Sequence, residues 1–268
     1  MAKTASLVFF YFGEDSYMRR LAQETVPVRK ALTGYDKQVL LWHQTDFGPF
    51  KVSKGAEKLA DIEDTPTKDN LFKYLNELGD EGYVVDLYIF SHGNKKGFLS
   101  SNGTYGDDGW VYKAQLEQHV KPLKLRMVWQ CNCQGSSLNE TWRKLGARVT
   151  AGSRFNNYYP TRFNGFIRRW LDGESFGQAV TESDNPMVRT GPQAFMIADA
   201  LTKLKEWDGN PFQAARVLGN NPPSRRFFTT CWIDEDEWQE GRSGKQNLNY
   251  SSRMLFSGQR NITKKTVW

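Results

Sequence analysis

The order of apolar and polar positions predicts alternating strands and helices over the first two thirds of the chain. Short apolar runs bounded by glycine or polar residues are typical of strands buried on both faces. Stretches in which apolar residues recur every three or four positions indicate amphipathic helices. The predicted strands are Leu7–Phe12, Val39–Trp42, Tyr83–Phe90, Leu125–Gln130 and Arg148–Ala151.

Helical patterns lie between these runs and after them. One begins at Asp69, a residue type that caps helix N-termini, and ends at Gly79. Another follows Ser136 or Ser137 as its cap and ends at Gly146. The remaining predicted helices are Lys113–Val120, Phe163–Val180 with an interruption near Gly173, and Ala194–Trp207.

This alternation predicts an α/β fold. Strands separated by helices pair in parallel through right-handed crossovers, which places helices on both faces of the sheet. Residues 1–190 are expected to form this domain. The pattern weakens after Pro186, so residues 191–268 are predicted to be a C-terminal extension that packs on the core.

Composition supports a folded chain without a membrane span. Of the 268 residues 39% are hydrophobic and 14% aromatic, which is ample for a core. The longest apolar run, Leu7–Phe12, is far below the roughly 20 residues that cross a bilayer. A secretory signal has a small-residue cleavage site after its apolar stretch, whereas the acidic residues Glu14 and Asp15 follow this run closely. We therefore expect a cytoplasmic protein.

Charge and cysteine content narrow the possible partners. The net charge is +6, yet basic and acidic residues are interspersed and no nucleic-acid-binding motif accompanies them. A solvated basic surface is therefore the plainer interpretation, and nucleic-acid binding is the weaker one. Three cysteines, Cys131, Cys133 and Cys231, are too few for a disulfide framework and are expected to be free thiols.

Two predicted strands end in residues that carry reactive side chains. One is followed by Ser91-His92-Gly93, and the other by Cys131-Asn132-Cys133-Gln134-Gly135. The carboxyl ends of strands in an open α/β sheet meet along one crevice. If the two strands are neighbours, His92 lies beside a cysteine there.

A histidine beside a cysteine can activate the thiol as a nucleophile. The imidazole takes the thiol proton and later protonates the leaving amine. Gly93 lacks a side chain, so its N–H can approach a substrate carbonyl and, with the N–H of Cys133, form an oxyanion hole.

The sequence resembles the caspase-like cysteine peptidases, which include caspases, metacaspases, legumains, gingipains and separases. The resemblance covers about residues 5–185 and rests on the His92-Gly93 and Cys133-Gln134-Gly135 strand ends, 41 residues apart. It implies a caspase-like α/β/α sandwich with a mainly parallel central sheet. It also implies a cysteine endopeptidase that uses His92 and Cys133, acts on peptides or proteins, needs no cofactor and can cut itself, with Ser100–Gly109 as a candidate loop.

The signature is incomplete before the nucleophile. Caspases have Gln-Ala where this chain has Cys131-Asn132, so cleavage after aspartate does not follow from the resemblance. Cys133 is the favoured nucleophile because Gln-Gly follows it, and Cys131 is the second choice. Residues two apart in a strand point to the same side, so Cys131 can also line the pocket or fill space.

Members of this superfamily differ mainly in the residue that precedes the scissile bond. An acidic pocket selects Arg or Lys, and a basic pocket selects Asp. More acidic than basic side chains are expected near the opening of the substrate pocket. This weakly favours a substrate with a basic residue before the scissile bond. The acidic candidates are Glu14, Asp15, Asp107 and Asp108, and the basic rival is Arg154.

Three alternatives compete with a peptidase. A zinc ion on His92, Cys131 and Cys133, completed by Cys231 or His119, is disfavoured by spacing. Structural zinc sites have two to four residues between paired cysteines, whereas one residue lies between Cys131 and Cys133. A caspase-like protein that only binds a peptide or a partner keeps the same residues. A nucleic-acid-binding protein would instead use the basic charge and the aromatic C-terminal part.

Overall fold

A computed structural model describes residues 2–12, 25–43, 58–101, 109–154, 161–184, 253–266 and 268. Seven strands form its central sheet, in the order β10-β9-β8-β4-β1-β2-β3. The neighbours from β9 to β3 pair in parallel, whereas β10 pairs antiparallel with β9. The strands are β1 (Thr4–Tyr11), β2 (Lys37–Leu41), β3 (Ile62–Asp64), β4 (Val84–Ser91), β8 (Leu125–Cys131), β9 (Val149–Ser153) and β10 (Met254–Gly258).

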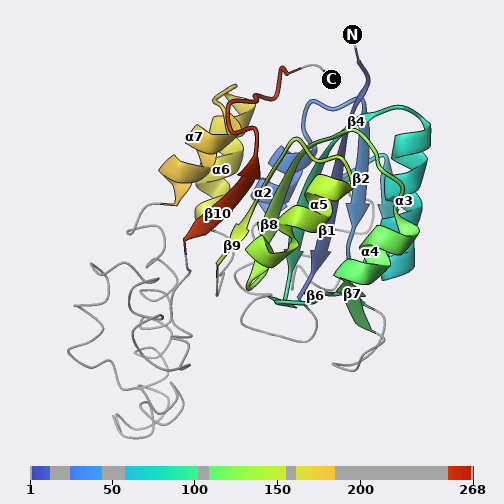
Figure 1. Ribbon diagram of the computed structural model, residues 1–268. Coiled ribbons are helices and arrows are strands. Elements are labelled where there is room, and N and C mark those ends of the chain that lie inside the picture. Colours follow the sequence, from blue (N-terminus) through green and yellow to red (C-terminus); the bar gives the residue numbers. More distant parts are fainter. Residues whose placement is uncertain are drawn as a thin grey trace, which may run out of the picture.

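Helices cover both faces of this sheet (Figure 1). One face packs against α2 (Thr25–Leu32), α6 (Thr161–Leu171) and α7 (Phe176–Ser183). The other packs against α3 (Lys68–Asp80), α4 (Lys113–His119) and α5 (Asn139–Lys144). The predicted α/β/α sandwich with a mainly parallel sheet is therefore confirmed. A small antiparallel sheet of β5 (Gly93–Asn94), β6 (Gly97–Leu99) and β7 (Trp110–Tyr112) lies outside the central one.

The central strands β4 and β8 are buried along their whole length. All their residues are buried, which explains why they read as continuous apolar runs in the sequence. On the α6 side, aromatic rings of Phe90, Trp129, Phe163 and Phe166 pack with centroids 4.7–5.8 Å apart. Each such ring contributes about 1.5–3 kcal/mol through burial. This packing fixes the two strands that carry the candidate residues.

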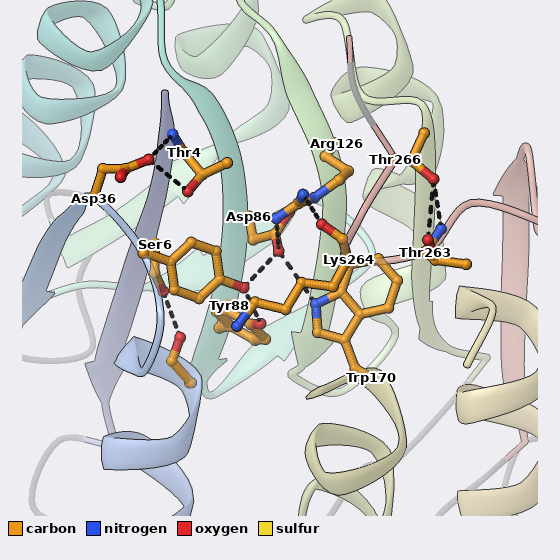
Figure 2. A network of polar contacts seen from close by, with 12 residues as sticks. Thr4, Ser6, Asp36, Asp86, Tyr88, Arg126, Trp170, Thr263, Lys264 and Thr266 are labelled. Carbon is orange, nitrogen blue, oxygen red and sulfur yellow. Dashed lines mark hydrogen bonds and ion pairs between the residues drawn. The ribbon is translucent and has the colours of Figure 1, made fainter. Parts of the chain in front are cut away.

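A buried ion pair joins β4 and β8 near their amino ends (Figure 2). Arg126 donates from Nε to Asp86 Oδ1 at 2.8 Å and from Nη2 to Asp86 Oδ2 at 2.7 Å. The Tyr35 hydroxyl donates to the same carboxylate at 2.5 Å, and Trp170 Nε1 donates at 3.2 Å. Three donor side chains thus compensate a carboxylate that is fully buried.

The C-terminal segment completes this network. Arg126 Nη1 donates to the carbonyl oxygen of Lys264. Lys264 Nζ donates to Thr33 O at 2.8 Å and lies 4.3 Å from the centre of the Tyr35 ring. Burial lowers the pKa of Lys264. Burial, reinforced by the charge of Asp86, raises the pKa of Tyr35 and of Tyr88 well above the ordinary value of a tyrosine.

Two predicted helix starts are wrong. The cap of α3 is Thr67, whose Oγ1 accepts from Asn70 N at 3.1 Å, so Asp69 lies within the first turn and the helix continues past Gly79. Ser136 and Ser137 lie in a 3₁₀ turn, η3 (Gly135–Leu138), rather than capping α5. The Ser137 hydroxyl instead donates to Lys95 O at 3.0 Å, which ties the turn to the loop between β5 and β6.

The strand predictions agree with β1, β2, β4, β8 and β9 to within a few residues, and the interruption near Gly173 separates α6 from α7. The sequence analysis missed α2, β3, the small sheet and β10. Because β10 pairs with β9, residues 254–258 belong to the central sheet. The predicted helix Ala194–Trp207 lies outside the described residues, and the boundary at residue 190 stays a prediction.

Candidate active site

The two strands that end in His92 and the cysteines are neighbours. β4 and β8 pair in parallel, with Phe90 opposite Cys131. Two residues further along each chain stand His92 and Cys133, just beyond the same edge of the sheet. The structure therefore brings together the two strand ends that the sequence singled out.

His92 is held by Phe12, which directly follows β1, and by contacts with Ser91 and the small sheet. Its ring packs edge-to-face on Phe12, with centroids 5.8 Å apart and planes at 84°, and its Nε2 is buried. The carbonyl oxygen of His92 accepts from Leu99 N at 2.9 Å and from the Ser91 hydroxyl at 3.0 Å. These contacts fix the backbone and one face of the imidazole.

The two cysteines at the end of β8 have different surroundings. Cys131 is 1% exposed and belongs to the core, and burial raises the pKa of its thiol well above the usual range. Cys133 follows the strand and is half-buried. A nucleophilic cysteine must be reachable by the substrate and must ionise to the thiolate. Burial among apolar side chains blocks the substrate and disfavours the thiolate. Cys131 therefore packs in the core, and Cys133 is the more accessible of these two thiols.

The turn after Cys133 has an uncommon backbone. Gln134 lies in the left-handed region with φ of 56° and ψ of 25°, which costs a non-glycine residue about 1 kcal/mol or more. Gly135 N donates to Asn132 O at 3.1 Å and closes the turn before η3 begins. The turn leads directly into η3, and a Cβ atom at Gly152 of β9 would lie 2.3 Å from Gly135 C.

Gly93 lies directly beside this turn. A Cβ atom at Gly93 would stand 2.7 Å from Cys133 O and 2.6 Å from Asn132 Nδ2, closer than real Cβ contacts. A residue without a side chain is thus required where the His92 turn meets the Cys133 turn. The predicted oxyanion-hole role of the Gly93 and Cys133 N–H groups remains a prediction that fits this closeness.

The predicted substrate-pocket residues fall mostly outside the described structure. Glu14, Asp15, Asp107 and Asp108 lie in residues that are not described. Arg154 follows β9 at the carboxyl edge, where its N–H donates to Arg253 O at 3.1 Å. The choice between a basic and an acidic preference stays a prediction.

The sequence analysis missed a buried ion pair near this edge. Arg162 of α6 is 2% exposed and pairs with Asp184 at 2.9 Å. Asp184 Oδ2 accepts from Met254 N at 2.7 Å, and Arg162 Nη1 lies 3.5 Å from Ser153 Oγ. The pair therefore connects the end of β9, at Ser153, with the start of β10, at Met254. No local sequence pattern marks it, because the partners come from separate segments.

Within the described ranges, no group of three or more His, Cys, Asp or Glu side chains could hold a metal ion. Of the residues considered for zinc, Cys231 lies outside the description, and the His119 ring stacks on Phe72 with centroids 5.5 Å apart. Among the same described residues, no helix has the length and apolar character needed to span a membrane.

Comparison with known proteins gives distant structural similarities only. No family model and no curated protein matches the chain. A secreted C11 cysteine protease from Bacteroides thetaiotaomicron, solved with an irreversible peptide inhibitor, has 12% identity and a TM-score of 0.43 over 68% of this chain and 58% of that one. A structure described as a protease has 12% identity and a TM-score of 0.39 over 96% of this chain and 48% of that one. The chain thus spans less than two thirds of the length of either.

Proposed function

We propose that this chain is a cysteine endopeptidase with Cys133 as nucleophile and His92 as general base and acid. The observation that carries the proposal is the pairing of β4 with β8, which sets His92 and Cys133 at adjacent strand ends. The burial of Cys131 supports the same choice of nucleophile. The sequence resemblance to caspase-like peptidases adds the expectation of a peptide or protein substrate.

The mechanism needs only these side chains and backbone groups. The His92 imidazole accepts the Cys133 thiol proton, and the thiolate attacks the carbonyl carbon of the peptide bond. The N–H groups of Gly93 and Cys133 hold the resulting oxyanion. The C–N bond then breaks while His92 returns the proton to the amine. In the second half, His92 deprotonates water, which attacks the thioester and releases the carboxylate and the thiol. This chemistry requires no cofactor.

Specificity, self-processing and location are finer parts of the proposal. A basic residue before the scissile bond fits the acidic residues near the expected mouth, Glu14, Asp15, Asp107 and Asp108. Self-cleavage within Ser100–Gly109 would be detected by N-terminal sequencing of the incubated protein, and an intact chain would contradict it. The free thiols of Cys131 and Cys133 fit a cytoplasmic setting.

A fluorogenic peptide library varied at the residue before the scissile bond tests the proposal. The wild type is compared with Cys133→Ala, His92→Ala and Cys131→Ala, with thermal unfolding as the folding control. We expect Cys133→Ala and His92→Ala to lose activity while remaining folded, and Cys131→Ala to keep it. A wild type that cleaves no peptide, or activity that survives Cys133→Ala, would overturn the proposal.

A further inference from the structure

A buried carboxamide stands between the two turns of the candidate site. Asn132 directly precedes Cys133 and is fully buried. A Cβ atom at Gly93 would lie 2.6 Å from Asn132 Nδ2 and 2.9 Å from its Cβ, and one at Gly135 would lie 2.9 Å from Oδ1. The side chain is therefore inserted between the His92-Gly93 turn and the Cys133–Gly135 turn, with its amide nitrogen toward the first and its oxygen toward the second.

The carboxamide makes no hydrogen bond with any described part of the chain. Both Nδ2 and Oδ1 of Asn132 are buried and lack a partner there. Leaving such a group unsatisfied costs about 1–3 kcal/mol, a cost that an apolar side chain of similar size would avoid. Stability alone therefore disfavours asparagine at this position.

A second buried asparagine shows how the same fold satisfies an amide. Asn139 Oδ1 accepts from Gln130 Nε2 at 3.0 Å and from Thr150 Oγ1 at 2.9 Å. Its Nδ2 donates to Leu255 O at 3.1 Å. Asn139 thus links β8, β9 and β10, with both its amide oxygen and its amide nitrogen hydrogen-bonded. Among the described residues, Asn132 has both polar side-chain atoms buried without a partner, whereas Trp129 in the core has one such atom, Nε1.

We propose that Asn132 is the positioning residue of the Cys133–His92 pair, an inference that rests on the peptidase function proposed above. Buried unsatisfied groups persist where function maintains them. The carboxamide keeps the two turns at a fixed spacing. It also directs the positive end of its dipole toward Gly93, where negative charge develops on the substrate oxygen during attack. A preorganised dipole stabilises that charge without touching it.

This role affects the transition state more than substrate binding. Loss of the dipole is expected to lower kcat about tenfold to a hundredfold, less than the 10²–10³ for a donor in direct contact. KM should change little, since the amide is fully buried and offers no surface for a peptide to contact. Replacement by aspartate places a negative charge where the dipole was positive, so its effect on kcat should exceed that of leucine.

The test compares wild type, Asn132→Leu, Asn132→Asp and the control Asn139→Leu on the library peptide that the wild type cleaves fastest. Rates are normalised to active protein, and thermal unfolding is measured for each variant. We expect Asn132→Leu to keep or gain thermal stability while its kcat falls, and Asn132→Asp to lose more kcat as the pH rises and its carboxyl ionises. Asn139→Leu should lose thermal stability with kcat per active molecule unchanged.

Each contrary result has a separate meaning. Wild-type kcat in Asn132→Leu, with the wild type active, overturns the positioning role and leaves the peptidase intact. Equal kcat losses in Asn132→Leu and Asn139→Leu, each matching its loss of folded protein, also overturn it, because the amide is then only structural. A wild type that cleaves nothing overturns both proposals.

Discussion

The two ends of the central sheet differ in how far their buried polar groups are hydrogen-bonded. At the amino end, the Asp86 carboxylate accepts hydrogen bonds from Arg126, Tyr35 and Trp170. At the carboxyl end, the amide of Asn132 is buried without a partner among the described residues, and Gln134 adopts a left-handed backbone. Complete compensation is typical of a region that stabilises the fold, whereas uncompensated cost is typical of a functional site.

This difference predicts separate responses to mutation at each end. Changes at the amino end should lower stability and spare the activity of the molecules that remain folded. Changes at the carboxyl end should lower activity more than stability. Variants and pH changes at each end test this separation.

Asp86→Ala should have the largest effect on stability, a loss of about 3–5 kcal/mol in the free energy of unfolding. The change leaves the Arg126 guanidinium buried without its counter-charge. Chemical denaturation of both proteins measures the loss. The double variant Asp86→Leu with Arg126→Met removes both charges and should recover much of it, and no recovery would contradict the ion-pair explanation.

Gly93→Ala should lower activity about a hundredfold with a smaller loss of stability, because the turn and Asn132 must move apart. The added Cβ would meet Asn132 Nδ2 and Cys133 O at 2.6 and 2.7 Å. Steady-state kinetics and thermal unfolding measure the two effects. Gly82→Ala is a control, since no atom lies within 4 Å of a Cβ there, although its φ of 80° adds backbone strain. Equal kinetic losses in both variants would contradict the prediction.

Alkaline pH should destabilise the amino end. Because the pKa values of Tyr35 and Tyr88 are raised by burial, these groups stay protonated in the folded chain while the unfolded chain ionises above about pH 10. Each then lowers the unfolding free energy by about 1.4 kcal/mol per pH unit above that point. Lys264, whose pKa is lowered by burial, acts in the opposite direction, but only below the ordinary lysine pKa of about 10.4.

Tyr35→Phe isolates this contribution. Unfolding curves between pH 9 and 11 should show a shallower decline for the variant than for the wild type, although the variant starts from a lower stability. Parallel declines would show that Tyr35 does not stay protonated in the folded protein.

Cys131→Ala should have the smallest effect, about 1 kcal/mol of stability and no loss of activity. Its thiol is in the core, and burial raises its pKa. Denaturation and library cleavage measure the two quantities. Loss of activity in a stable Cys131→Ala variant would assign the nucleophile to Cys131.

Much of the fold was predictable because the central strands are buried on both faces. Continuous apolar runs and the glycine and polar residues that bound them mark β1, β4 and β8. β10 has no such signal, because it is partly exposed and follows the Gly/Ser/Asn-rich stretch 241–252. Its place depends on pairing with β9, a contact about 100 residues away along the chain.

The residues of the candidate site could be predicted from the sequence, but their burial and contacts could not. His92 and Cys133 stand out because each follows an apolar strand. The difference between Cys131 and Cys133 depends on where β8 ends within the core, which spacing alone left open. The isolation of Asn132 depends on Gly93 and Gly135 meeting around it, and no single stretch of sequence records that contact.

Site-resolved labelling by an irreversible peptide electrophile tests the central claim most directly. The wild type, Cys131→Ala and His92→Ala are treated with the same peptidyl electrophile, digested, and analysed by mass spectrometry for the modified cysteine. The account predicts an adduct on Cys133 in the wild type and in Cys131→Ala, and far slower labelling in His92→Ala. Modification of Cys131 or Cys231 instead, or equal labelling of Cys133 without His92, would contradict it.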